Sequence, residues 1–163
     1  MLKNIFGKKQ RTMLHAPVSG KVVPLEEVPD PVFSEKMMGE GIAIIPTDGN
    51  IFAPFDGEIV QLPETKHAIG LMDKDGNEVL IHIGLDTVEL KGEGFTPKVK
   101  TGDAVSAGQP LMELDLEYLQ ENAKSIVTPI VITNSANSGK EIQLTEEKEA
   151  SAGVTVLLTI TGK

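Results

Sequence analysis

The sequence predicts an all-β fold, an antiparallel β-sandwich of many short strands with one or two short helical turns. Its 163 residues include 16 glycines and 10 prolines but only 4% aromatic residues, a composition typical of a chain with many turns. Short apolar runs recur along it, and turn residues separate them. Only one stretch has the apolar spacing of a helix. Because the chain is 40% hydrophobic, it can bury the core of one domain of ordinary size.

The first predicted region is a flexible N-terminal leader, residues 1–13, which holds four of the fifteen basic residues. Such a segment is a solvated tail or makes a weak contact with a membrane surface or a partner. No apolar signal-peptide core follows it. Residues 14–163 are predicted to form a single domain.

An internal sequence repeat predicts two similar corners of the sandwich. Residues 16–25, APVSGKVVPL, match residues 53–62, APFDGEIVQL. Each copy is an Ala-Pro-x-x-Gly turn followed by an apolar strand. Further strands are predicted at residues 41–46, 67–72, 79–83, 95–99, 111–114, 126–133, 142–144 and 154–160.

One helix is predicted from Asp115 to Lys124. Leu116, Leu119 and Ala123 recur there at helical spacing, and Asp115 is a suitable N-cap. Many short strands with one short helix indicate an all-β sandwich.

The charge and the missing residue types exclude several function classes. The formal net charge is -9, whereas a nucleic-acid binder needs a basic face. An acidic protein instead suits a basic protein partner. The absence of cysteine excludes disulfides, thiolate metal sites and a cysteine nucleophile in this chain. No apolar run approaches the roughly 20 residues that span a bilayer, so we expect no membrane insertion and a cytoplasmic location.

Two histidines beside one predicted hairpin are the candidate reactive groups. His82 lies in the run EVLIHIGLD, where alternation places Val79, Ile81 and Ile83 on one face and His82 on the other. A lone histidine in such a strand is most often structural. However, His67 opens the preceding strand. A register that pairs His67 with His82 brings the rings together, whereas a shift of one residue places them on opposite faces.

Two neutral imidazoles on an open face suit three chemistries. Metal binding needs further ligands, which no Cys or His-rich motif supplies. General acid–base catalysis on a small substrate uses the same groups. In covalent phosphoryl transfer, one ring attacks and the other donates a hydrogen bond to the phosphate. There is no Gly-rich phosphate loop with a following lysine, so ATP is not expected as the direct donor.

Residues 29–43, PDPVFSEKMMGEGIA, and residues 65–70, TKHAIG, match two segments of a known family. The first resembles the entry segment, and the second the first histidine motif, of the glucose-class IIA component of the bacterial phosphoenolpyruvate-dependent sugar phosphotransferase system. Residues 80–88, LIHIGLDTV, resemble its phosphorylation-site motif. Residues 91–95 and 123–125 also match, so the similarity covers most of the chain.

This resemblance implies a role for each residue of the site. His82 accepts a phosphoryl group on Nε2 from the histidine-containing phosphocarrier protein and passes it to a cysteine on the IIB domain of a glucose-type sugar permease. His67 holds the phosphate and the transfer state, and Thr65 orients His67. The backbone carbonyl of Gly84 fixes the His82 ring. No cofactor is required, although His67 and His82 also suit an adventitious or regulatory zinc ion.

The resemblance also implies an apolar docking ring around the histidines, with acidic residues at its rim. Flexible methionines suit a surface that binds several partners, and the alternative for the two methionines is packing in the core. The expected apolar positions are Val32, Phe33, Met37, Met38, Ile69, Leu71 and Val88, and the expected acidic positions are Asp30 and Asp86.

Two other function classes compete with this interpretation. Biotinyl- or lipoyl-type carrier domains share the Ala-Pro-x-x-Gly turns and the GDAVSAGQPL segment, and Lys74 lies in a predicted hairpin turn. However, Asp73 and Asp75 flank Lys74, in place of the Met-Lys-Met of a biotin site. A non-catalytic interaction module gives no reason to place two histidines together. The sugar, the regulatory partners and the oligomeric state are open at this point.

Overall fold

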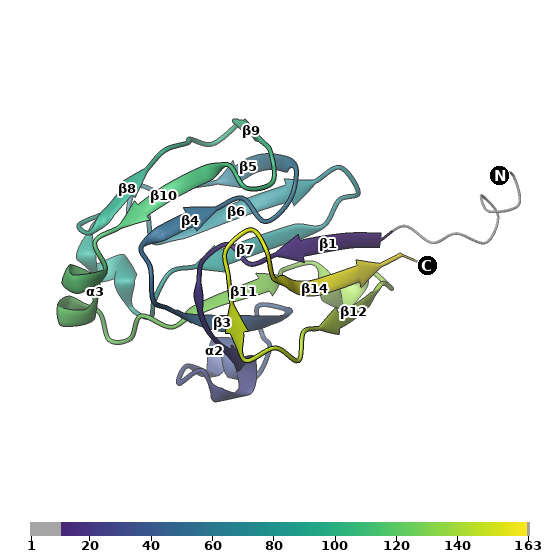
Figure 1. The fold of residues 1–163 in the computed structure, drawn as a ribbon, viewed down its shortest axis with the longest axis horizontal. Helices are drawn as coiled ribbons and strands as arrows, with labels where there is room; N and C mark the ends of the chain where they lie inside the picture. Colours follow the sequence, from purple (N-terminus) through teal and green to yellow (C-terminus); the bar gives the residue numbers. More distant parts are fainter. Residues whose placement is uncertain (1–10, 163) are drawn as a thin grey trace, which may run out of the picture.

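The computed structural model describes residues 11–162, which form antiparallel strands joined by turns and short helical segments (Figure 1). The all-β prediction is therefore confirmed. The strands are β1 (Arg11–His15), β2 (Gly20–Pro24), β3 (Glu40–Pro46), β4 (Asn50–Phe52), β5 (Gly57–Gln61), β6 (Ala68–Asp73), β7 (Glu78–His82), β8 (Phe95–Pro97), β9 (Ala104–Val105), β10 (Pro110–Leu114), β11 (Thr128–Ile132), β12 (Glu141–Leu144), β13 (Glu149–Ala150) and β14 (Val156–Thr161). The helical segments are η1 (Leu25–Glu27), α2 (Pro31–Ser34), η2 (Thr87–Leu90), α3 (Leu116–Asn122) and η3 (Ser135–Asn137).

Three sheets build the sandwich. The large sheet has eight strands in the order β13-β2-β3-β11-β7-β6-β5-β9, and two three-stranded sheets have the orders β1-β14-β12 and β4-β10-β8. The two small sheets lie in front of the large one in Figure 1. The main cluster of buried apolar side chains joins all three sheets, with Leu14 from β1, Leu111 from β10 and Ile81 from β7. This cluster is the core between the layers.

A second buried cluster lies on the other face of the large sheet. The segment from η1 to α2 contributes Leu25 and Phe33 to it, and β7 contributes Leu80. Successive residues of a strand face opposite sides, so Ile81 enters the main core while Leu80 and His82 face outward. The fold thereby places His82 beside the segment that covers this outer face.

Most predicted elements are confirmed to within two residues. The predicted helix is α3, and Asp115 caps it because its carboxylate accepts a hydrogen bond from the Tyr118 N–H at 3.1 Å. Both copies of the internal repeat form the expected corners, since β2 and β5 follow the two Ala-Pro-x-x-Gly turns. The short strands β4, β9 and β13 are not predicted, because two or three residues give too little alternation to detect.

The predicted leader ends too late. Residues 1–10 lie outside the described part of the chain, but Arg11, Thr12 and Met13 belong to β1 and pair with β14. The strand is not predicted because its sequence, RTMLH, has no apolar run. Only Leu14 of this strand is fully buried. Within residues 11–162, no helix has the length and hydropathy needed to cross a membrane.

Candidate active site

His82 is the last residue of β7, and its half-buried ring bonds to the loop that follows. Its Nδ1 lies 2.8 Å from the carbonyl oxygen of Gly84. A carbonyl oxygen can only accept a hydrogen bond, so Nδ1 carries the proton. The neutral ring therefore keeps its lone pair on Nε2. The fold thus determines which nitrogen of His82 can act as the nucleophile.

Only glycine fits at position 84. Its φ is +78°, a region that side chains disfavour. A Cβ added there lies 2.7 Å from the Cγ2 of Thr87 and 2.9 Å from the carbonyl oxygen of Ser125. This tight turn is what brings the Gly84 carbonyl back to the ring of His82.

His67 lies directly beside His82. The two ring centroids are 5.1 Å apart and the ring planes meet at 79°. The Nδ1 of His67 lies 2.8 Å from the hydroxyl of Thr65. Among residues 11–162, both rings form hydrogen bonds through Nδ1, and no buried side-chain nitrogen or oxygen lacks a partner. Because neither Nε2 has a partner there, both Nε2 atoms reach solvent.

The rings meet without the direct cross-strand pairing that the sequence analysis required. Ala68 is opposite His82 in the β6–β7 ladder, which is the register that was expected to place the two rings on opposite faces. His67 precedes β6 and follows Lys66, whose φ is +60°. The alternation of β6 therefore does not set the direction of the His67 ring. The Ile83 N–H still ties this segment to β7, because it donates to the His67 carbonyl at 2.7 Å.

The surroundings of the two rings favour their neutral forms. Phe33 packs on His82 with ring centroids 5.0 Å apart. Burial lowers the pKa of His82, while the hydrogen bond to Gly84 and the charges of Asp30 and Asp86 act in the opposite direction. The pKa of His67 is also lowered, first by burial and then by the neighbouring His82. A neutral imidazole is the form that can attack an electrophile.

An open hollow of about 280 Å³ lies in front of His82. Asp30, at its edge, also caps α2 by accepting a hydrogen bond from the Val32 N–H at 3.0 Å. Besides His82, the hollow is lined by Asp30, Val32, Phe33, Met38, Asp86, Thr87 and Val88.

The expected docking ring is partly wrong. Ile69 and Leu71 are fully buried in the main core, because alternation in β6 directs them to the face of the sheet opposite His82. Phe33 is only 3% exposed and lies against the His82 ring. The exposed apolar positions are Val32, Met37, Met38 and Val88, and we call these four residues the docking ring from here on.

The described residues offer an incomplete metal site. Among residues 11–162, no three His, Cys, Asp or Glu side chains gather to hold an ion. His67 and His82 supply two ligands, whereas a closed zinc site has four. A zinc ion at this pair needs ligands from another molecule.

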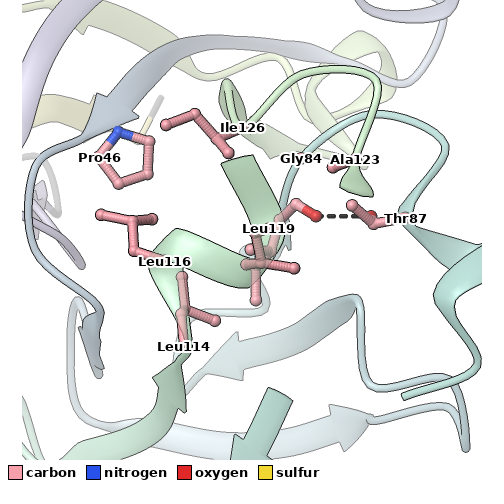
Figure 2. Close-up of a pocket in the computed structure, with 9 residues that line it drawn as sticks. Pro46, Gly84, Thr87, Leu114, Leu116, Leu119, Ala123 and Ile126 are labelled. Carbon is pink, nitrogen blue, oxygen red and sulfur yellow. Dashed lines mark hydrogen bonds between the residues drawn. The ribbon is translucent and has the colours of Figure 1, made fainter. Parts of the chain in front are cut away.

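Thr87 is a residue of the site to which the sequence analysis gave no role. It is fully buried, and its hydroxyl donates to the Ile83 carbonyl at 2.6 Å. Figure 2 shows this bond beside Gly84, facing the apolar space behind the loop. A threonine that bonds to the carbonyl four residues earlier is a known local pattern. Every threonine has a residue four positions earlier, and residues 84 and 86 are left-handed, so the sequence offers no signal for this contact.

Comparisons with known proteins place this site in a family. The family model described as phosphoenolpyruvate-dependent sugar phosphotransferase system, EIIA 1, matches residues 12–138. The PTS system glucose-specific EIIA component of Bacillus cereus is 49% identical over 166 aligned positions, which cover 100% of both chains. That of Oceanobacillus iheyensis is 46% identical and covers 98% of this chain and 99% of the relative.

A solved structure agrees with the sequence comparisons. The glucose permease IIA from Mycoplasma capricolum has a TM-score of 0.85 and 38% identity, and the match covers 92% of this chain and 96% of that one. The chain therefore belongs to the EIIA 1 family of the phosphoenolpyruvate-dependent sugar phosphotransferase system, in which it is a phosphoryl carrier.

Proposed function

We propose that His82 carries the phosphoryl group on Nε2. The donor is the histidine-containing phosphocarrier protein, and the acceptor is a cysteine on the IIB domain of a sugar permease. The names of the relatives favour a glucose-type permease. The observation that carries this proposal is the hydrogen bond from Nδ1 to the Gly84 carbonyl, because it leaves Nε2 as the free nucleophile of the ring.

Each transfer exchanges one bond to phosphorus for another. In the first, the Nε2 lone pair of His82 attacks phosphorus, and the donor imidazole leaves with the electron pair of its P–N bond. In the second, a thiolate sulfur attacks phosphorus and the Nε2–P bond breaks, which returns His82 to its neutral form. The same contacts that raise the pKa of His82, from Gly84, Asp30 and Asp86, stabilise the positive charge of the phosphorylated ring.

His67 supports the phosphoryl group in this proposal. When the Thr65 hydroxyl donates to Nδ1, the proton of the neutral His67 ring lies on Nε2. This N–H can then donate to a phosphoryl oxygen on His82, since the two rings are neighbours. A hydrogen bond to the transferring group stabilises its charge in the transition state.

Both reaction partners are proteins, and the surface around the hollow suits them. The docking ring offers apolar side chains that a partner can cover. Asp30 and Asp86 flank it with negative charge, and the whole chain has a formal net charge of -9. We therefore expect partners with a basic rim around an apolar centre, whose association slows as salt is added.

The experiment is phosphoryl labelling from phosphoenolpyruvate with the purified general enzymes of the phosphotransferase system. The wild type should gain an acid-labile, base-stable phosphoryl group, and His82→Ala should gain none. His15→Ala is the matched control, because His15 is also half-buried but does not line the hollow. Normal labelling of His82→Ala contradicts the proposal.

A further inference from the structure

The backbone that follows His82 is tied down on both sides of one residue. The Ile83 N–H donates to the His67 carbonyl at 2.7 Å, and the Ile83 carbonyl accepts from the Thr87 hydroxyl at 2.6 Å. Ile83 is thus the link between the second histidine and Thr87. A change at Thr87 therefore acts on the backbone that carries both rings.

The next peptide group holds the ring of His82. The Leu85 N–H donates to the Ser125 carbonyl at 2.9 Å. The C=O and N–H of a trans peptide point in opposite directions. The Gly84 carbonyl, which shares this peptide group with Leu85, is therefore directed away from Ser125 and toward His82.

Of the three hydrogen bonds that hold Ile83 and Leu85, only the one from Thr87 comes from a side chain. Its methyl group packs against Gly84 so closely that a Cβ there lies 2.7 Å from it. The apolar space behind Thr87 has no room for a water molecule (Figure 2). No water can enter that space to replace the hydroxyl, so its loss leaves the Ile83 carbonyl without a donor there.

We propose that Thr87 is a positioning residue for phosphoryl transfer. Its hydroxyl holds the Ile83–Gly84 backbone so that the Gly84 carbonyl keeps the proton of His82 on Nδ1. This leaves Nε2 free to attack. The proposal rests on the proposed function of His82, but the tautomer of His82 can be measured without any phosphoryl donor.

The test compares Thr87→Val, which keeps the shape and loses the hydroxyl, with Thr87→Ser, which keeps the hydroxyl. Long-range ¹H–¹⁵N spectra of the unphosphorylated protein report the tautomer, and labelling from phosphoenolpyruvate reports the rate. In Thr87→Val, we expect the Nε2–H tautomer to gain population. Phosphoryl acceptance should fall about tenfold or more, as when a group that orients an imidazole is lost. Thr87→Ser should restore both.

Thr133→Val is the matched control. The Thr133 hydroxyl also donates to a β7 carbonyl, that of Glu78, at 3.3 Å, but at the end of the strand away from His82. This variant should keep both the tautomer and the rate. If Thr87→Val does not fold, Thr87→Cys replaces it, because a thiol is a weak donor. The tautomer of His82 and the rate of phosphoryl acceptance should then change in the same directions but by smaller amounts.

A lower unfolding midpoint with an unchanged tautomer and rate means that Thr87 is merely structural and overturns the proposal. A shifted tautomer in the variant supports it, even if the wild type accepts no phosphoryl group. A wild type that accepts no phosphoryl group rejects the proposed function of His82 instead. The two failures are therefore distinguishable.

Discussion

Polar side chains lie beside buried apolar strands at both ends of the β6–β7 hairpin, but the two ends differ in how these side chains form hydrogen bonds. At the turn, Asp73 is nearly buried, and its carboxylate accepts from the Asp75 and Asn77 N–H groups and from the Asn77 side chain. Lys140 donates to the Asn77 side-chain oxygen at 2.8 Å. These polar groups bond to one another, so this end is a structural unit.

At the opposite end, each histidine is bonded through one nitrogen only. Nδ1 of His82 and Nδ1 of His67 have partners, while both Nε2 atoms reach solvent, and His82 also lines an open hollow. This difference supports the proposal that the histidine pair is the reactive site and that the turn cluster is structural. The bonded nitrogen fixes the ring, and the free nitrogen is available for chemistry.

The largest expected effect is at the reactive end. In His67→Gln, we expect His82 to accept the phosphoryl group, but transfer to the IIB cysteine should fall by about 10²-fold, because the imidazole that stabilises the leaving phosphoryl group is lost. Rapid-quench measurement of transfer from the phosphorylated variant tests this. An unchanged transfer rate would remove His67 from the reactive pair. Thr133→Val, which removes a hydrogen bond to the same hairpin away from the site, should transfer normally.

The turn end should respond in stability rather than in activity. Asp73→Ala removes a buried carboxylate that accepts three hydrogen bonds. It should lower the free energy of unfolding by about 2–3 kcal/mol, measured in urea, with normal phosphoryl acceptance by the folded protein. Asp48→Ala, at an exposed turn, should change stability by less than about 0.5 kcal/mol. If the folded Asp73→Ala variant does not accept the phosphoryl group, the turn end also affects activity, which contradicts the proposed difference between the two ends.

The docking ring should give a smaller effect. Met38 lines the hollow and is 36% exposed, and Met38→Ala should raise the KM for the phosphocarrier protein about fivefold, or about 1 kcal/mol, with kcat unchanged. Val154→Ala is the control, since Val154 is exposed but does not line the hollow. Equal KM values in all three proteins would show that partners dock elsewhere.

The last prediction concerns the pKa of His67. Burial and then His82 lower this pKa in the free protein. A phosphoryl dianion on His82 should raise it, because negative charge favours the protonated ring. NMR titration of the His67 ring before and after phosphorylation measures the shift, with His15 as the internal reference. A pKa that stays constant or falls would place the phosphoryl group away from His67.

Alternation predicted which side of β7 each residue faces, because a period of two is fixed by strand geometry. It therefore separated His82 from Ile81 correctly. It left the register open, because register depends on the backbone of the turn. It also gave the wrong direction for the His67 ring in this register, because Lys66 has a φ of +60°, which no propensity predicts for lysine.

The same limit explains the errors in the docking ring. The resemblance placed Ile69 and Leu71 in the docking ring beside the histidines, but His67 lies outside β6, whose alternation directs both side chains into the main core. Phe33 belongs to α2, and only packing against the sheet shows that it is buried. The resemblance to a family supplied the identity of the pair and the direction of transfer, which spacing alone left open.

The most direct test of the account is to identify the phosphorylated nitrogen. Long-range ¹H–¹⁵N spectra with ³¹P coupling, recorded on the phosphorylated wild type, distinguish the four imidazole nitrogens of His67 and His82. The hydrogen bond from Nδ1 to the Gly84 carbonyl predicts phosphorus on Nε2 of His82, with the proton still on Nδ1. Phosphorus on Nδ1 of His82, or on either nitrogen of His67, would contradict the account.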